Sequence, residues 1–225
     1  MKFNSNFLII SPHPDDEILG CGGLIKKIKK NGGKVSVIVI CNHLPPLYTQ
    51  EEANKILNEM KKCHQFLNID HSINFNYQAC LLNKTEEYLL NNKLLEKIIS
   101  LKPSYVFIPF PDRHQDHKIV FESAMVATRP KKNVKFIKQV YCYETVSETF
   151  WNAPEIEKNF IPDTFVNISN EIDEKLKSLK IYSSQVNEND FERSFKTIKS
   201  LSIFRGSQVG YEYAESFKLI RSRFD

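Results

Sequence analysis

Residues 35–41, with the sequence VSVIVIC, narrow the choice of fold more than any other stretch of this chain. The run is largely β-branched and lacks the polar–apolar alternation of a strand with one exposed face. A strand of this kind is buried on both faces, which is typical of parallel sheets covered by helices. Apolar runs at residues 7–11 and 105–109 have the same character. We therefore expect an α/β fold with a mostly parallel sheet.

Strand and helix patterns alternate along most of the chain, which indicates a parallel sheet with helices on both faces. The pattern is weaker beyond Trp151. The expected strands are residues 7–11, 35–41, 72–75, 105–109, 138–143 and 164–168, the expected helices are residues 18–31, 51–67, 86–101, 118–126, 171–182 and 191–204, and residues 211–221 are strand or mixed structure.

Length and composition suit one globular domain, residues 1–225, with a small C-terminal α/β elaboration: 41% of the 225 residues are hydrophobic and 26% are charged. The net charge is +4, and the lysine clusters at residues 26–30 and 131–135 are short. Such clusters are typical of a solvated surface, so we do not expect a nucleic-acid partner. The sequence leaves the oligomeric state open.

The N-terminal residues lack a signal-peptide pattern, and no apolar run approaches the roughly 20 residues that span a bilayer. The five cysteines are odd in number and have no CxxC spacing. This usage favours reduced thiols over a disulfide framework. We therefore predict a cytoplasmic protein with no stable membrane insertion.

Two clusters of ionisable residues follow expected strands. Residues 13–17 (HPDDE) come after the strand at 7–11, and residues 112–117 (DRHQDH) come after the strand at 105–109. Gathering carboxylates at buried strand ends is costly unless a cation neutralises them. Open α/β sheets bind ligands at the carboxyl ends of their strands. The two clusters together predict a metal-centred hydrolytic site.

The spacing within the clusters suggests a role for each of five residues. His13 and Asp16 lie three positions apart across a turn, and His117 can join them from the second cluster. Two imidazoles and one carboxylate are a common catalytic Zn²⁺ set that leaves one position for water. Asp15 is then free to act as general base. His114 can protonate the leaving amine or stabilise the developing oxyanion.

The remaining residues of the second cluster are expected to support this chemistry. We count Asp116 among the catalytic residues, because it can orient and charge one of the histidines. Asp112 and Arg113 lie at the expected pocket edge, where they can contact substrate hydroxyls or an anionic group. In the C-terminal part, Arg205 and Glu215 are expected to form a structural ion pair beneath the site.

At these residues the chain resembles the LmbE/PIG-L family of zinc-dependent N-acetylglucosamine deacetylases. The resemblance spans nearly the whole chain. It is carried by HPDDE at residues 13–17, a glycine-rich helix start at 20–23, HQDH at 114–117, YSSQ at 182–185, Arg205-Gly206, Gly210 and YAESF at 213–217.

The resemblance implies a Rossmann-like fold, zinc held by His13, Asp16 and His117, Asp15 as base and His114 as the charge-stabilising acid. It also implies a small-molecule substrate, an acetylated amino sugar or sugar conjugate, from which acetate is released. The chain departs from the family in two loops on the substrate side. Family members often have a Thr/Asn-Gly turn after the second strand, whereas residues 42–46 of this chain read NHLPP. Many members also have an arginine early in the second helix, whereas residues 51–59 here contain none and only Lys55 could substitute.

Three alternatives remain open from sequence alone. The first is a metal-dependent hydrolase of another amide. The second is a non-haem Fe(II) oxygenase, which uses a similar ligand set but usually on an all-β barrel. The third is a non-catalytic module that binds a sugar or a protein partner.

Overall fold

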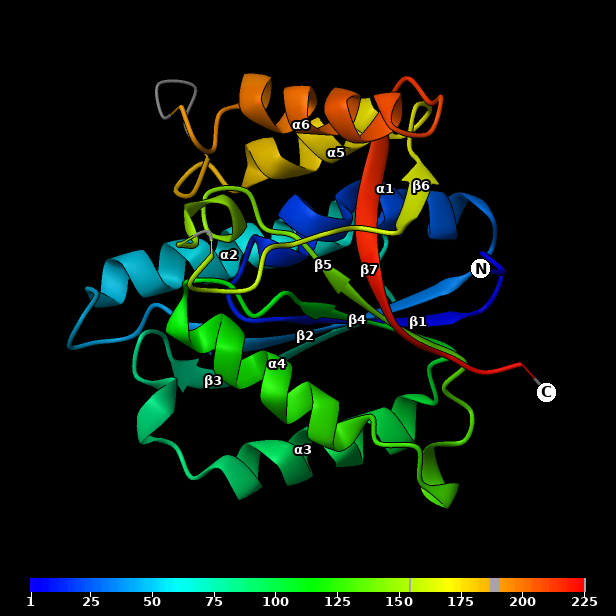
Figure 1. Ribbon diagram of the computed structural model, residues 1–225. Helices are drawn as coiled ribbons and strands as arrows, with labels where there is room; N and C mark the ends of the chain where they lie inside the picture. The colour runs from blue at the N-terminus through cyan, green and yellow to red at the C-terminus, as the bar shows by residue number, and fades with distance from the viewer. Residues whose placement is uncertain (154, 187–190, 225) are drawn as a thin grey trace.

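The computed structural model describes residues 1–153, 155–186 and 191–224. Its centre is a seven-stranded sheet in the order β3-β2-β1-β4-β5-β7-β6 (Figure 1). Strands β1 to β5 pair in parallel, while β7 runs antiparallel to both β5 and β6. The expectation of a mostly parallel, Rossmann-like sheet is confirmed.

The elements alternate along the chain as the sequence indicated. The strands are β1 Asn6–Ser11, β2 Lys34–Asn42, β3 His71–Gln78, β4 Tyr105–Pro109, β5 Gln139–Tyr143, β6 Thr164–Asn167 and β7 Ala214–Ser222, and the helices are α1 Asp16–Lys30, α2 Gln50–Phe66, α3 Glu87–Leu101, α4 Gln115–Ala127, α5 Ile172–Ile181 and α6 Phe195–Ser207.

Helices cover both faces of the sheet. Helices α1, α2, α5 and α6 lie on one face, and α3 and α4 lie on the other (Figure 1). Alternate residues of β1 divide the interior, since Phe7 and Ile9 pack into one apolar cluster and Leu8 and Ile10 into the other. The β-branched central strands are thus buried on both sides, which is the environment their composition predicted.

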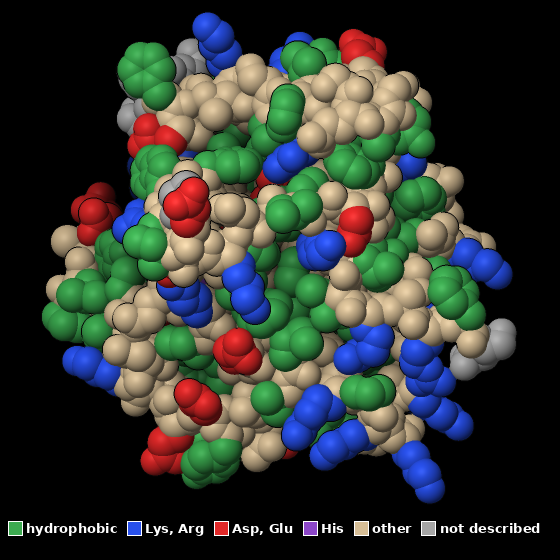
Figure 2. Space-filling model, in the orientation of Figure 1, with side chains coloured by type: hydrophobic (Ala, Val, Ile, Leu, Met, Phe, Trp, Pro, Cys, Tyr) green, Lys and Arg blue, Asp and Glu red, His purple; other side chains and the backbone are tan. Residues whose placement is uncertain are grey.

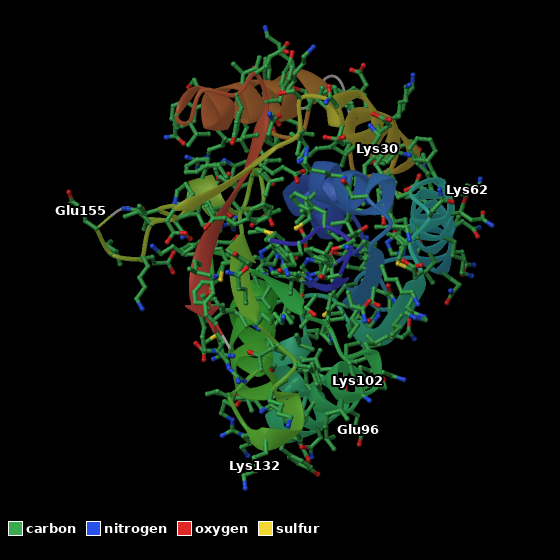
Figure 3. All side chains as sticks on the ribbon, turned by 90° about the vertical axis from the view of Figure 1, so that its right-hand side faces the viewer. Lys30, Lys62, Glu96, Lys102, Lys132 and Glu155 are labelled. Carbon is green, nitrogen blue, oxygen red and sulfur yellow. The ribbon has the colours of Figure 1, made fainter. Side chains whose placement is uncertain are left out.

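The face in Figure 2 carries hydrophobic side chains among the charged ones, and lysine and arginine side chains gather toward its lower right. Lys62, Lys102 and Glu96 point outward in Figure 3. Among the described residues, no helix combines the length and apolar character that crossing a membrane requires.

The sheet order reverses direction between β1 and β4, which are neighbours in the sheet although β2 and β3 lie between them in the chain. In doubly wound sheets this switch point opens a crevice at the carboxyl ends of the strands, because the following helices leave to opposite faces. Both sequence clusters follow these two strands. The topology therefore brings the clusters together.

Some boundaries differ from the expected ones. Helix α4 begins at Gln115 rather than 118, because His114 caps it and its Nδ1 accepts the Asp116 N–H at 3.1 Å. Helix α6 begins at Phe195 rather than 191, after an N-cap at Ser194. The tail that was expected as strand or mixed structure forms β7.

The expected ion pair between Arg205 and Glu215 is wrong. Glu215 accepts the backbone N–H groups of Gly23 and Leu24, both at 2.8 Å, and pairs with Lys175 at 2.6 Å. Arg205 instead pairs with Glu144 at 2.6 Å. Glu215 thus joins α1, α5 and β7. Its carboxylate oxygens are occupied by these donors and not by Arg205.

We predict that Glu215→Ala lowers the free energy of unfolding by about 3–5 kcal/mol, because it leaves the Lys175 ammonium buried without its partner. Lys218→Ala is the matched control: the Lys218–Asp163 pair is 42% exposed on each side, and exposed pairs contribute about 0–1 kcal/mol. Urea denaturation of the two variants measures the difference. Equal losses would contradict this role of Glu215.

Candidate metal centre and active site

The first cluster lies in a strained turn between β1 and α1. Asp15 has a φ of 111°, which is unfavourable for any residue with a Cβ. Glu17 holds the turn: its Oε2 accepts the Asp15 N–H and the Ser11 hydroxyl, both at 3.1 Å. Its Oε1 accepts the Tyr182 hydroxyl at 2.6 Å. Glu17 therefore fixes the backbone that presents Asp15 and Asp16.

The second cluster forms the turn between β4 and α4. Asp112 Oδ1 accepts the His114 N–H at 3.0 Å. His114 is the N-cap, so Asp116 and His117 lie in the first turn of α4, where both are buried. This geometry directs both of these side chains toward the end of β1.

Three nitrogen and oxygen atoms from the two turns converge. Asp16 Oδ2 lies 3.2 Å from His13 Nδ1 and 3.2 Å from His117 Nε2. His117 Nε2 is buried and makes no well-aligned hydrogen bond among the described residues, although Asp16 Oδ2 lies within ion-pair distance. Ligand atoms of a tetrahedral ion lie about 3.3 Å apart when each is about 2.0–2.2 Å from it. Asp16 Oδ2 therefore lies at the spacing of two ligands of one divalent metal ion from each of the two nitrogens.

His114 is a competing ligand, since ring nitrogens of His13, His114 and His117 lie within 4.8 Å of one another. However, His114 Nδ1 accepts the Asp116 N–H. His13 and His117 each have a nitrogen directed at Asp16 instead. We therefore favour Asp16, rather than His114, as the third ligand.

Each metal-facing histidine has a carboxylate on its other ring nitrogen. His13 Nε2 lies 2.8 Å from Asp116 Oδ2, and His117 Nδ1 lies 3.1 Å from Asp112 Oδ2. Such carboxylates orient a ligating imidazole and raise its basicity. Asp116 and Asp112 thus lie where carboxylates that orient the two imidazoles would lie, and the orienting role of Asp116 stays a prediction.

These carboxylates also set the proton affinity of the two histidines in the metal-free protein. Burial lowers the pKa of His13, but Asp116 and Asp16 outweigh it and raise the value to about 9. Burial acts likewise on His117, yet Asp16 and Asp112 raise its pKa to about 10. Both rings are therefore protonated at neutral pH and must lose a proton to bind a metal.

Asp15 lies beside the convergent atoms and is paired with Arg193, whose Nη1 is 2.9 Å from Asp15 Oδ2. Burial raises the pKa of Asp15 to about 8, while Arg193 acts in the opposite direction. A cation on the neighbouring ligands would favour the ionised form further. Asp15 is thus a carboxylate with the proton affinity that a general base needs near neutral pH.

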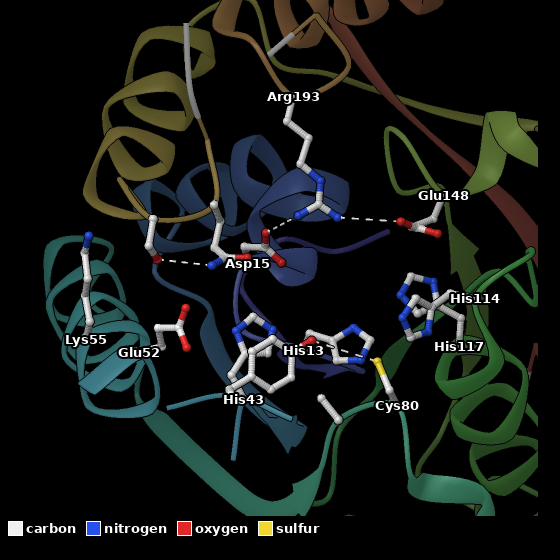
Figure 4. A pocket seen from close by; sticks show the side chains of 14 residues that line it. His13, Asp15, His43, Glu52, Lys55, Cys80, His114, His117, Glu148 and Arg193 are labelled. Atoms are coloured by element: carbon white, nitrogen blue, oxygen red, sulfur yellow. Dashed lines mark hydrogen bonds and ion pairs between the residues drawn. The ribbon is translucent and has the colours of Figure 1, made fainter. Parts of the chain in front are cut away.

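The cluster opens into a cavity of about 550 Å³. His13, Asp15, His114 and His117 line its floor (Figure 4). Arg193 reaches across it between Asp15 and Glu148, which lies 3.9 Å from Arg193 Nη2. The facing wall carries the stacked rings of His43 and Tyr48, with centroids 4.2 Å apart, together with Glu52 and Lys55.

Asp112 and Arg113 do not lie where the sequence suggested. Neither is among the described residues that line the cavity. Asp112 is fully buried against His117 and Thr149. Arg113 is half-exposed and lies over the ring of Trp151, 5.6 Å from its centroid. The β4–α4 turn directs Asp112 inward and Arg113 outward, and contact of either residue with substrate stays a prediction.

Sequence reasoning missed Arg193. It lies far from both clusters, between α5 and α6, in a stretch without a strong pattern. The signal that pointed toward it was indirect: the second helix lacks an arginine at the position where the family often has one. Lys55, the suggested substitute, does line the cavity.

The fold and the site together define a class: an α/β enzyme with a histidine–carboxylate metal site at the switch point of its sheet. A family model described as "PIG-L: GlcNAc-PI de-N-acetylase" matches residues 8–128, more than half of the chain. The chain belongs to this family. It is a de-N-acetylase, an enzyme that hydrolyses the amide bond between an acetyl group and an amino sugar.

Relatives agree with this assignment. A diacetylchitobiose deacetylase from Thermococcus kodakarensis is 24% identical over 231 residues, which cover 96% of this chain and 84% of the relative. The structure of N,N'-diacetylchitobiose deacetylase from Pyrococcus horikoshii has a TM-score of 0.76 at 21% identity, covering 96% of this chain and 83% of that one.

The fold alone does not determine the reaction. The structure of 4-carboxy-2-hydroxymuconate hydratase from Pseudomonas putida KT2440 has a TM-score of 0.74 at 16% identity, and the match covers 98% of each chain. At such identities the solved structures establish a common fold only. The family match is what identifies the chemistry.

We predict that metal binding at pH 7 releases close to two protons, because His13 and His117 start protonated with pKa values of about 9 and about 10. Metal affinity should rise as pH increases toward those values and fall as pH decreases. Calorimetric titration with Zn²⁺ in two buffers of different ionisation enthalpy measures the proton count. Binding without proton release would show that the two imidazoles are neutral in the metal-free protein.

Proposed function

We propose that this enzyme is a Zn²⁺-dependent N-deacetylase of an acetylated amino sugar or sugar conjugate. The observation that carries the proposal is that Asp16 Oδ2 lies 3.2 Å from both His13 Nδ1 and His117 Nε2, and that His117 Nε2 is buried. Two nitrogens and one carboxylate oxygen are a donor set that suits zinc and leaves a position open toward the cavity.

Zinc bound there would supply Lewis-acid polarisation of the amide carbonyl and would acidify the attacking water. Asp15 takes a proton from the attacking water while the water oxygen bonds to the carbonyl carbon. Asp15 later returns the proton to the amide nitrogen as the C–N bond breaks. The products are acetate and a free amine.

His114 stabilises the negative charge that develops on the carbonyl oxygen. Because its Nδ1 accepts the Asp116 N–H, the ring proton lies on Nε2, and His114 lines the cavity. An N–H donor held in place before the reaction stabilises an oxyanion without reorganisation. Asp116 contacts both histidines: the Asp116 backbone N–H donates to His114 Nδ1, and the Asp116 carboxylate pairs with His13 Nε2.

Arg193 positions Asp15. Its Nη1 contacts one carboxylate oxygen at 2.9 Å, and its Nε donates to the Ser147 hydroxyl at 3.0 Å. The guanidinium is thus anchored on one side while it holds Asp15 on the other. It favours the ionised form of the base and fixes its direction, since a cation nearby stabilises the carboxylate.

The cavity wall favours a sugar. The stacked His43 and Tyr48 offer an aromatic edge to a pyranose ring, while Glu52 and Lys55 offer hydrogen bonds to hydroxyl groups. A small acetylated amino sugar, alone or joined to a second group, suits a cavity of about 550 Å³.

We place the enzyme in the cytoplasm, since all five cysteines are free. We also propose that residues 1–225 form one domain.

The alternatives left open by the sequence have less support. An Fe(II) oxygenase is disfavoured by the α/β sheet and the family match. A non-catalytic module is disfavoured because the ligands, base and oxyanion donor line one cavity or lie directly behind it.

We predict that Asp15→Asn lowers kcat for acetate release by about 10²–10⁴-fold, the usual contribution of a general base. Metal content should stay near one equivalent, because Asp15 is not a ligand. His117→Ala is the matched comparison and should lose both metal and activity. Metal analysis and acetate assays on Zn²⁺-loaded protein, with a panel of N-acetylated amino sugars, test this. An active Asp15→Asn enzyme would overturn the assignment of the base.

We predict that Arg193→Gln lowers kcat by up to about 10²-fold through misplacement of Asp15, with little change in KM or metal content. Arg193→Lys should recover part of the loss, since it restores the positive charge. Glu148→Gln, on the other side of Arg193, should have the smaller effect. A rise in KM with unchanged kcat would show instead that Arg193 binds substrate.

A further inference from the structure

Glu148 is a carboxylate of the cavity wall that has cations near it but few hydrogen-bond donors. It lies across the guanidinium group of Arg193 from Asp15 (Figure 4). Arg193 Nη2 is 3.9 Å from its Oε1, and Arg113 Nη1 is 3.7 Å from its Oε2. Both distances exceed that of a hydrogen bond. The Oε2 atom is buried and has no hydrogen-bond partner among the described residues.

The backbone next to Glu148 is fixed relative to the proposed metal site. The Thr149 hydroxyl donates to Asp112 Oδ2 at 3.0 Å, and the same oxygen lies 3.1 Å from His117 Nδ1. Thr149 Oγ1 also accepts the Thr145 N–H at 2.9 Å, which closes the turn that contains Glu148. The Glu148 side chain is only 12% exposed. An acceptor held in this way before a ligand arrives can select that ligand by its geometry.

The surroundings of Glu148 indicate which chemical group would complete its contacts. An ionised carboxylate only accepts hydrogen bonds, and an acceptor that stays buried without a donor costs free energy. The two guanidinium groups already offset its negative charge, so the missing partner is a donor and not a further cation. A hydroxyl group is an uncharged donor, and it is the group that sugars carry in greatest number.

We infer that Glu148 accepts a hydrogen bond from the 3-hydroxyl group of the substrate and thereby selects an amino sugar over simpler amides. The inference rests on the proposed function, because it specifies the substrate of that same cavity. Asp15 and Glu148 lie on two sides of one guanidinium group, that of Arg193. When the amide lies beside Asp15, Glu148 therefore faces a substituent next to the amide. In a 2-acetamido sugar this is the 3-hydroxyl, since in a conjugate the oxygen on the first carbon carries the second group.

The other carboxylates that line the cavity, among the described residues, are Asp15 and Glu52. Asp15 is the proposed base. Glu52 lies on the exposed surface of α2, and its Oε2 already accepts the N–H and the hydroxyl of Thr49 at 2.8 and 2.9 Å. An exposed carboxylate exchanges water for a sugar hydroxyl with little net gain. Glu148 is therefore the carboxylate best placed to discriminate, and Glu52 provides the matched control.

The first experiment compares kcat/KM of the Zn²⁺-loaded, full-length protein for N-acetylglucosamine and its 3-deoxy and 6-deoxy analogues. The wild-type protein should prefer N-acetylglucosamine to the 3-deoxy analogue by about 10–100-fold, the discrimination expected of one hydrogen bond to a charged acceptor. Glu148→Met, which removes both acceptor oxygens, should abolish this preference. Glu148→Gln keeps one acceptor oxygen and should retain part of it. If Glu148→Met fails to fold, the partial loss in Glu148→Gln tests the inference by itself.

The controls separate substrate contact from an indirect effect through Arg193. Glu52→Gln should keep the preference for the 3-hydroxyl, and the ratio between N-acetylglucosamine and the 6-deoxy analogue should be the same in every variant. If Glu148 acted only by its charge on Arg193, Glu148→Gln and Glu148→Met would slow all three sugars by one common factor, and the ratios would stay as in the wild-type protein. That result overturns the inference.

The second experiment needs no turnover. Calorimetry measures the affinity of the same Zn²⁺-loaded proteins for glucosamine and 3-deoxyglucosamine, the amine products, and should show the same preference in the wild type and its loss in Glu148→Met. This preference in a protein that hydrolyses none of the acetylated sugars supports the role of Glu148 and counts against the proposed reaction. Equal hydrolysis of N-acetylglucosamine and its 3-deoxy analogue by the wild-type protein supports the reaction and overturns the role of Glu148. A protein that neither binds nor hydrolyses these sugars overturns both.

Discussion

The crowding of negative charge at the switch point of the sheet is the constraint on which the rest of the site depends. Asp15, Asp16, Glu17, Asp112 and Asp116 are all buried at the ends of two adjacent strands. Burying several carboxylates together is tolerated only where cations and donors compensate them. Here the compensation comes from two protonated imidazoles, Arg193 and backbone N–H groups. Replacing the two imidazole protons by one divalent ion conserves this balance of charge.

The residues of the proposed metal site form successive layers around the point where the ion would bind. Asp16 and two histidines face the centre, while Asp112 and Asp116 stand behind the histidines and fix their orientation. Glu17 lies below and holds the strained turn. Because a rotamer shift of any one of these groups breaks a buried hydrogen bond, the site is rigid before metal or substrate arrives.

Much of this arrangement could be predicted from the sequence because it depends on local signals. The continuous apolar strands implied a parallel sheet, and the two clusters at residues 13–17 and 112–117 implied that their side chains would meet at one edge of it. The role of Asp112 could not be predicted, because whether a turn residue points inward depends on where α4 begins. Arg193 and the true contacts of Glu215 were inaccessible for a related reason: Arg193 meets Asp15 178 residues away, and Glu215 meets Gly23 192 residues away.

The contact between Tyr182 and Glu17 has a consequence for how the molecule folds. Tyr182 follows α5, so its hydroxyl ties the C-terminal third of the chain to the turn that presents Asp15 and Asp16. Docking of that third and organisation of the turn are therefore thermodynamically coupled. By linkage, each favours the other: an ion that binds only the organised turn strengthens the attachment of the last helices, far from any atom it touches.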